Sequence, residues 1–244
     1  MYLIIDIGNT LAKLFLYQEN QCLHQEKVVL TQFSDKAALL IKSHPKLQWI
    51  VYSDVGHKYS DFFEKYEVGA FAVMKVNSRL QLPFVNKYET PESLGSDRIV
   101  LLSAAAKLYP NTPVLIIDLG TCITYDFLDE NAVYEGGAIS PGFEMRYKAL
   151  HQQTAMLPKL ESKAIASPVG KSTHDAIHAG VYFGILGEIN ARISYYKQQF
   201  GPLTVILTGG DANKLPKTLK NSIFAHQNFV AIGMLHLLEL NTNS

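Results

Sequence analysis

The sequence predicts an α/β fold that is built twice along the chain, and an internal repeat is the main observation behind this prediction. Residues 4–8 read IIDIG and residues 116–120 read IIDLG, nearly half the chain apart. Each segment contains a short β-branched run typical of a buried strand. Each then leads through a Thr-containing turn into an alternating segment, at 11–17 and 122–128, and on to a third apolar stretch. The pattern predicts a three-stranded meander that occurs twice.

Helical patterning follows each predicted meander. In the first half, residues 90–92 (Thr-Pro-Glu) predict a helix start, and apolar residues recur at helical spacing from 99 to 108. In the second half, Ser172 or Thr173 is predicted to cap a long helix. The remaining predicted elements are strands at 48–53, 70–76 and 203–208 and a terminal helix at about 229–240.

The composition narrows the class of partner and compartment. The chain has 22 Lys and Arg residues against 22 Asp and Glu residues, so it lacks the basic excess that nucleic acid or an anionic membrane would favour. The N-terminus, MYLIIDIGNT, lacks the basic region of a signal peptide. Cys22 and Cys122 have no metal-ligand spacing, which predicts two unbridged thiols in a reducing compartment. We therefore expect a cytoplasmic protein with no membrane or nucleic-acid partner.

Two aspartates stand where a strand meets a glycine turn, and both indicate phosphate chemistry. Asp6 and Asp118 each lie two residues before a glycine at the end of a predicted strand. A glycine there lets the backbone approach an anion, while amides and a Thr or Asn side chain donate hydrogen bonds. The segment 208–211 (Thr-Gly-Gly-Asp) is a third turn of this kind. One such turn is usually structural, but three in a duplicated chain favour a site for a metal-bound polyphosphate.

Other nucleotide and metal motifs are incomplete. Residues 170–173 resemble the end of a Walker A loop, but Ile165 occupies the position of its first glycine. His174 and His178 are four residues apart without an HEXXH motif, a pattern more typical of a solvated helix face than of a metal site. Cys122 lies inside the second aspartate turn, where a structural role is expected.

The three turns together resemble the nucleotide motifs of the acetate and sugar kinase, Hsp70 and actin superfamily. Within it, the segment 88–98, with Tyr, Pro and Leu-Gly-Ser-Asp-Arg at the family's spacing, resembles the substrate motif of type III pantothenate kinases. Two further motifs of that family follow in order, at 136–142 and 170–173. Leu11 is a mild departure, because a more polar residue is expected there. The resemblance implies duplicated ribonuclease H-like (actin-like ATPase) halves, 1–113 and 114–244, with mixed sheets flanked by helices and a nucleotide cleft between them.

The same resemblance implies an ATP-dependent kinase that phosphorylates the 4'-hydroxyl of pantothenate, the first step of coenzyme A biosynthesis. It implies a homodimer with the substrate site near the interface. Asp97 would be the general base, Asp118 the ligand of a monovalent cation (potassium or ammonium), and Asp6 would lie near Mg²⁺. The implied ATP-binding residues are Asp6, Ile7, Gly8, Asn9, Thr10, Leu11, Ala12, Lys13 and Thr121. The implied substrate-binding residues are Tyr88, Gly95, Ser96, Asp97, Arg98 and Thr173.

The chemistry of Asp97 agrees with that role, although alternatives exist. Phosphoryl transfer requires positioning, charge neutralisation and an acceptor for the hydroxyl proton, and a carboxylate can be that acceptor. Without the flanking motif, Asp97 beside Arg98 would be interpreted as a surface ion pair at a helix start. At the level of the whole chain, the alternatives are a kinase of another small alcohol, such as a sugar, and an accessory or regulatory protein that binds ATP without using it.

Overall fold

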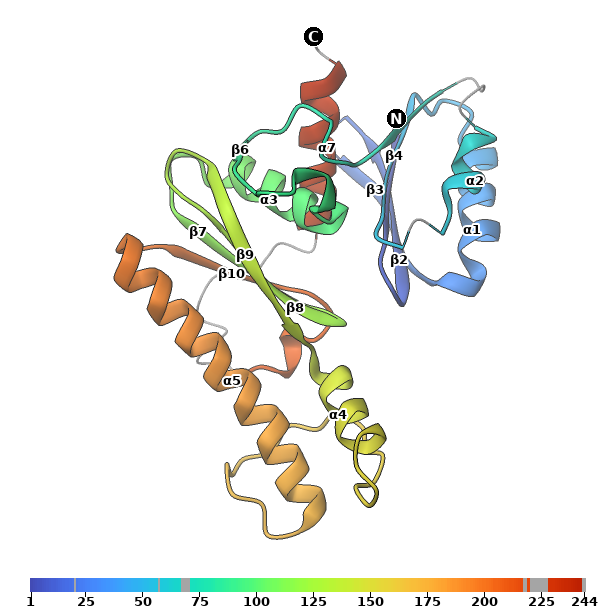
Figure 1. Ribbon diagram of the computed structural model, residues 1–244. Helices are drawn as coiled ribbons and strands as arrows, with labels where there is room; N and C mark the ends of the chain where they lie inside the picture. The colour runs from blue at the N-terminus through green and yellow to red at the C-terminus, as the bar shows by residue number, and fades with distance from the viewer. Residues whose placement is uncertain (20, 57, 67–70, 217–218, 220–227, 243–244) are drawn as a thin grey trace. The chain divides into compact units, whose positions relative to one another are not determined.

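The structure is a computed structural model that describes residues 1–19, 21–56, 58–66, 71–216, 219 and 228–242 (Figure 1). Its residues form two compact units, which are described separately. The first unit contains residues 1–110 and 132–134 and the C-terminal helix, and the second contains residues 111–131 and the described residues from 135 to 219.

The first unit is built on a five-stranded mixed sheet. Its order is β3-β2-β1-β4-β5, with β1 antiparallel to β2 and parallel to β4. Strand β1 is an almost continuous apolar run because helices cover both faces of the sheet. The strands are β1 (Tyr2–Ile7), β2 (Leu11–Gln18), β3 (Gln21–Val29), β4 (Trp49–Asp54) and β5 (Ala72–Lys75).

Helices α1 (Leu30–Ser43) and α2 (Ser60–Glu64) cover one face of this sheet. Aromatic side chains fill the space between them and the strands, and the rings of Tyr52 and Phe63 stack at 3.7 Å. Helices α3 (Ser96–Leu108) and α7 (Phe229–Thr242) pack against each other and contact β4, and α7 also contacts β1. Gly233 permits the close crossing of α3 and α7, because a Cβ there would collide with the carbonyl oxygen of Val100.

The second sheet repeats the topology of the first. Its order is β10-β7-β8-β9-β6, with β7 antiparallel to β8 and parallel to β10. Strands β7, β8, β9 and β10 thus correspond to β1, β2, β3 and β4. Strand β6 pairs with the first residues of β9, which group with the first unit. The strands are β6 (Val85–Asn86), β7 (Val114–Leu119), β8 (Cys122–Leu128), β9 (Val133–Pro141) and β10 (Thr204–Thr208).

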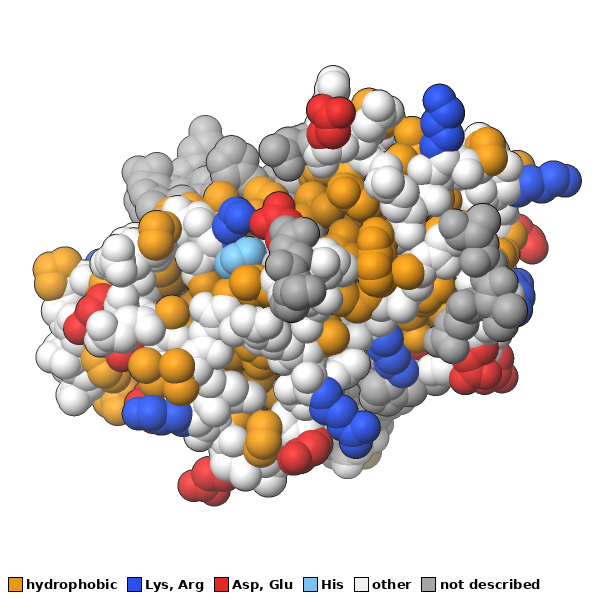
Figure 2. Space-filling model, turned by 90° about the horizontal axis from the view of Figure 1, so that it is seen from above, with side chains coloured by type: hydrophobic (Ala, Val, Ile, Leu, Met, Phe, Trp, Pro, Cys, Tyr) orange, Lys and Arg blue, Asp and Glu red, His pale blue; other side chains and the backbone are white. Residues whose placement is uncertain are grey.

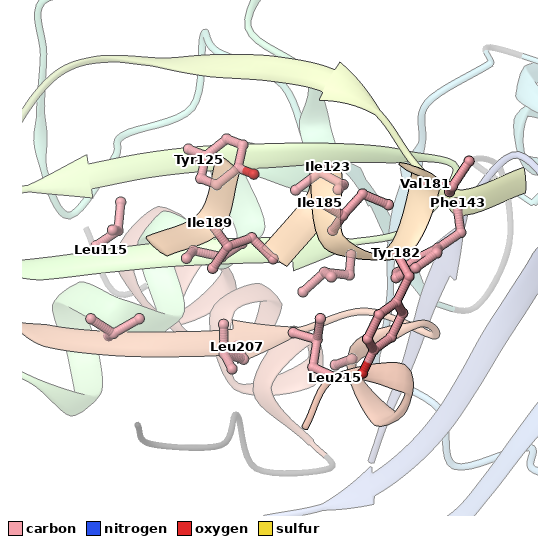
Figure 3. Close-up of a cluster of buried hydrophobic side chains, with 14 of the residues drawn as sticks. Leu115, Ile123, Tyr125, Phe143, Val181, Tyr182, Ile185, Ile189, Leu207 and Leu215 are labelled. Atoms are coloured by element: carbon pink, nitrogen blue, oxygen red, sulfur yellow. The ribbon is translucent and has the colours of Figure 1, made fainter. Parts of the chain in front are cut away.

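The long helix α5 (Thr173–Phe200) lies along one face of the second sheet, and α4 (Phe143–Gln152) packs against it. Figure 3 shows the core between α5 and the sheet, where Ile185 and Ile189 of α5 pack against Ile123 and Tyr125 of β8. Odd-numbered residues of β7 and β8 face this core. The even-numbered residues, Asp118 among them, therefore lie on the opposite face of the sheet.

The structure confirms the two meanders and most other predicted elements, with three differences. The helix predicted to open at residues 90–92 begins at Ser96, since Pro91–Ser93 form only a 3₁₀ turn before Gly95. Helices α1, α2 and α4 and the short strand β6 were not predicted as individual elements. The strand predicted at 70–76 runs from Ala72 to Lys75, and position 70 lies outside the described residues.

Three features bear on the expectations drawn from composition: the surface charges, the cysteines and the apolar character of the helices. Figure 2 shows Lys and Arg side chains scattered among Asp and Glu side chains on the face that it draws. Both cysteines are free thiols. Within the described part of the chain, no helix has both the length and the apolar character needed to span a membrane.

Candidate functional site

Asp6 is held between side chains of the two neighbouring strands. The strand register places it opposite Lys13 on β2 and Ser53 on β4. The Ser53 hydroxyl donates a hydrogen bond to Asp6 Oδ1 at 2.8 Å, and the Lys13 ammonium donates one to Oδ2 at 3.2 Å. Asp6 is only 9% exposed, so these contacts balance a nearly buried carboxylate.

The turn after Asp6 carries two exposed polar residues. The Gly8 N–H donates to the Leu11 carbonyl at 3.0 Å and closes the turn, while Asn9 and Thr10 are exposed. Ile7 and Ala12 point into the core of the first unit, so their side chains are not available to a ligand. The side-chain amide of Asn9 and the hydroxyl of Thr10, with the nearby Lys13 ammonium, are groups suited to an anion.

The Gly95 turn fixes the position of Asp97. Gly95 precedes the first residue of α3, and Asp97 lies in the first helical turn, where the helix dipole favours an anion. Asp97 Oδ1 accepts the Arg98 N–H at 2.8 Å. A Cβ on Gly95 would lie 2.5 Å from that same oxygen, so the carboxylate occupies space that only glycine leaves open.

Arg98 is buried among aromatic rings. It is 5% exposed, and its Nη2 donates to the Tyr134 hydroxyl at 2.6 Å. The guanidinium lies 5.5 Å from the centre of the Tyr88 ring, and the Tyr88 and Tyr134 rings stack at 6.1 Å. The structure thus brings the predicted Tyr88 and Arg98 together. The Arg98 side chain is thus buried rather than on the surface.

Asp118 has a setting like that of Asp6. The register places it opposite Thr124 on β8 and Thr208 on β10. The Gly120 N–H donates to the Cys122 carbonyl at 3.0 Å and closes the following turn, at which Thr121 is exposed.

Two glycines allow other segments to approach the Asp118 turn. Gly142, just before α4, donates its N–H to the Thr121 carbonyl at 3.1 Å, and a Cβ there would collide with the Gly120 carbonyl. Gly209, just after β10, has φ +94° and lies against the backbone of Leu119. Both the steric contact and the left-handed backbone require glycine at 209. The segment 208–211 thus packs directly on the end of β7.

A polar network holds the segment leading into α4. Glu188 of α5 accepts hydrogen bonds from Tyr125 at 2.9 Å, from Ser140 at 2.5 Å and from Arg146 Nη2. Arg146 Nε also donates to the Pro141 carbonyl at 2.8 Å. Burial raises the pKa of the Glu188 carboxyl, but the three hydrogen bonds outweigh it, so the pKa lies below its ordinary value. Burial, followed by the bond to Glu188, raises the pKa of Tyr125.

Thr173 is exposed at the first residue of α5, as predicted for a helix start. Ser172 is the cap, since its hydroxyl oxygen accepts the Asp175 N–H at 3.1 Å. His178 Nδ1 lies 2.8 Å from the Tyr147 hydroxyl. Among the described residues, no group of three His, Cys, Asp or Glu side chains is placed to hold a metal ion.

The sequence patterns did not single out three residues that lie beside the predicted site residues: Ser53, Thr124 and Tyr134. Ser53 interrupts an apolar strand near its end, which is a detectable signal. The contact between Tyr134 and Arg98 joins residues far apart in the chain and has no local signal.

Solved structures define the class of fold. The chain matches a Campylobacter jejuni protein, described as a candidate transcriptional activator of the Baf family, with a TM-score of 0.63 and 21% identity over 99% of this chain and all of that one. It matches a Sinorhizobium meliloti protein, described as a candidate 2-dehydro-3-deoxygalactonokinase, with a TM-score of 0.60 and 12% identity over 98% of each chain. The fold is that of the actin-like sugar kinases.

Sequence relatives define the family. The family model of type III pantothenate kinases matches residues 2–194. The chain is 42% identical over 241 residues to a type III pantothenate kinase of Christiangramia forsetii, with 99% of each chain covered. It is 40% identical over 230 residues to one of Flavobacterium johnsoniae, with 94% of each covered. The chain belongs to the type III pantothenate kinase family.

Proposed function

We propose that this protein is a pantothenate kinase that transfers the γ-phosphoryl group of ATP to the 4'-hydroxyl of pantothenate, the first step of coenzyme A biosynthesis. The family match over residues 2–194 is the observation that carries this function. The Gly95–Arg98 turn supports this proposal. Its Asp97 carboxylate lies beside Gly95, and its arginine is buried against Tyr134.

The nucleotide is assigned to the glycine turns. The exposed turn from Gly8 to Thr10 and the Lys13 ammonium would bind phosphates of ATP, and Thr121 would make a second contact. In this assignment the halves 1–113 and 114–244 are the two ATPase halves. Ile7, Leu11 and Ala12 would bind ATP through their main chain. The side chains of Ile7 and Ala12 are buried and would not contact it.

Asp6 fits a role beside Mg²⁺. Its two carboxylate oxygens each hold one donor, Ser53 and Lys13, and an ionised carboxylate has about four lone-pair sites. Oxygen ligands are the ones that Mg²⁺ prefers. When bound, the ion neutralises charge on the transferring phosphoryl group. Lys13 and Ser53 orient the carboxylate towards that role.

Asp97 is assigned as the general base. As the hydroxyl oxygen of pantothenate bonds to the γ-phosphorus, the bond from that phosphorus to the bridging oxygen breaks and ADP leaves. The hydroxyl proton passes to the Asp97 carboxylate. Tyr88, Gly95, Ser96, Arg98 and Thr173 would line the pantothenate pocket.

Three further properties complete the proposal. Asp118 would be a ligand of a monovalent cation, potassium or ammonium. The protein would act as a homodimer with the substrate site near the interface, and it would work in the cytoplasm.

A coupled assay of ATP consumption tests the function. Purified protein with Mg²⁺ and potassium should turn over pantothenate and leave glucose and glycerol unphosphorylated. Faster turnover of glucose or glycerol than of pantothenate would favour a kinase of another small alcohol. ATP binding without turnover of any acceptor would favour a regulatory protein.

A further inference from the structure

The two repeats differ at one position beside their aspartates. In the first unit, the residue across the antiparallel pair from Asp6 is Lys13, whose ammonium lies 3.2 Å from the carboxylate. In the second unit, the residue across from Asp118 is Thr124. Each pair lies one step before the turn, next to Ile7 and Leu119 respectively. The second repeat therefore has a neutral hydroxyl where the first has a built-in cation.

The other neighbour of each aspartate is similar in the two repeats. Ser53 on β4 and Thr208 on β10 both carry a hydroxyl at the position paired with the aspartate. Both repeats therefore have a carboxylate with a hydroxyl-bearing residue on one side. They differ on the other side, where the first has lysine and the second has threonine.

The hydroxyl of Thr124 is buried and lacks a hydrogen-bond partner in the described part of the chain. Thr124 is only 7% exposed. A buried hydroxyl that makes no hydrogen bond costs free energy, so such an atom in a folded protein requires an explanation, such as an ion or a water. Residues directly opposite in a strand pair have their side chains on the same face, which places Thr124 on the Asp118 face of the sheet.

We propose that Thr124 helps to hold the monovalent cation of Asp118, and that this ion takes the place beside Asp118 that the Lys13 ammonium takes beside Asp6. This inference rests on the proposed cation site at Asp118 and adds to it an oxygen ligand, the buried Thr124 hydroxyl. The hydroxyl oxygen has lone pairs that can face a cation, and potassium is bound by oxygen dipoles together with charge. Ammonium suits the same place, because it is a lysine head group without its side chain.

The inference is tested by ion-dependent thermal stability of the full chain. The melting temperature is measured while potassium chloride replaces sodium chloride at constant ionic strength, with Mg²⁺ and ATP present and pantothenate absent. For the unmodified protein it should rise with potassium. Thr124→Val keeps the shape and removes the hydroxyl, so the potassium concentration at half-maximal effect should rise about fivefold to tenfold. Thr124→Ser should stay within about twofold, because it restores a hydroxyl.

A buried hydroxyl elsewhere supplies the control. Ser103 in α3 is fully buried and donates to the Ile99 carbonyl at 2.8 Å. Ser103→Ala should lower the melting temperature without moving the potassium midpoint. If Thr124→Val titrates like the unmodified protein, Thr124 is only structural and the inference is overturned.

Thr124→Lys gives the complementary test. A tethered ammonium in the second repeat should abolish the potassium response and make turnover equal in sodium and potassium. A folded Thr124→Lys protein that keeps the full potassium response would overturn the inference, and the Val and Ser variants decide if Thr124→Lys does not fold. An unmodified protein without any potassium response would overturn the cation site itself, whereas the pantothenate assay tests the kinase function independently.

Discussion

The Asp97 carboxylate lies over the Cα of Gly95, and a Cβ on residue 95 would be 2.5 Å from Asp97 Oδ1. The backbone of Gly95 has φ −57°, so alanine is compatible with the turn itself and conflicts only with the carboxylate. The two residues are thus coupled sterically. The glycine of the motif keeps the proposed base in place.

Gly95→Ala should therefore displace the carboxylate while the fold is retained. We expect kcat to fall by about tenfold to a hundredfold, since misplacement of a reacting group by about 1 Å can have this effect. The KM for ATP should change little. Gly187→Ala is the matched control, because nothing lies within 4 Å of a Cβ there. Unchanged turnover in Gly95→Ala would show that the carboxylate position does not matter.

Asp97→Asn tests the chemistry rather than the position. The amide has nearly the same shape but cannot take the hydroxyl proton, so turnover should fall by about a hundredfold or more. Circular dichroism and ATP titration should match the unmodified protein. Asp61→Asn, in the first turn of α2, is the control for a lost charge. Near-normal turnover in Asp97→Asn would leave Asp97 with a structural role only.

Tyr134→Phe removes the hydroxyl that accepts the hydrogen bond from Arg98 Nη2. Because Arg98 is buried, we expect the free energy of unfolding to fall by about 1 to 3 kcal/mol in urea denaturation. The KM for pantothenate should rise, since Tyr88 and Arg98 belong to the proposed pocket. Tyr195→Phe, on the exposed part of α5, should change neither quantity. A Tyr134→Phe protein as stable as the original would mean that Arg98 does not depend on this hydroxyl.

The sequence predicted the parts of the fold and site that depend on local pattern. Asp6 and Asp118 were predicted at strand ends because a β-branched run followed by glycine is a local signal. The start of α3 was predicted too early because Thr90 and Pro91 resemble a helix start. In the structure they open only a 3₁₀ turn, and the backbone is non-helical at Gly95 before α3 begins. The residues that lie beside each aspartate on the neighbouring strands could not be predicted from local pattern. The strand register alone decides which residue lies across from each aspartate.

Glu188→Gln should change the pH dependence of stability. The hydrogen bonds to Glu188 hold its pKa below the ordinary value of 4.5, so the folded state gains stability above that value. This stability is lost as the pH falls through the lowered pKa. The melting-temperature difference between the unmodified protein and Glu188→Gln should therefore be largest near about pH 7 and shrink below about pH 4. Glu64→Gln, exposed on α2, should show no such change, and a difference independent of pH would contradict the role of the network.

Asp118→Asn should remove the dependence of turnover on the monovalent cation together with most of the activity. One magnesium ion with ATP needs one principal carboxylate beside it, and Asp6 has the Lys13 and Ser53 contacts that orient it. Asp118 is the proposed ligand of a second ion, one that would neutralise crowded phosphate charge. Turnover of the unmodified protein should rise when potassium or ammonium replaces sodium at equal ionic strength, and the rates of Asp118→Asn should be low and equal in all three salts. Equal rates in sodium and potassium for the unmodified protein would mean that Asp118 serves magnesium or the fold, since a carboxylate in either role does not distinguish the two alkali ions.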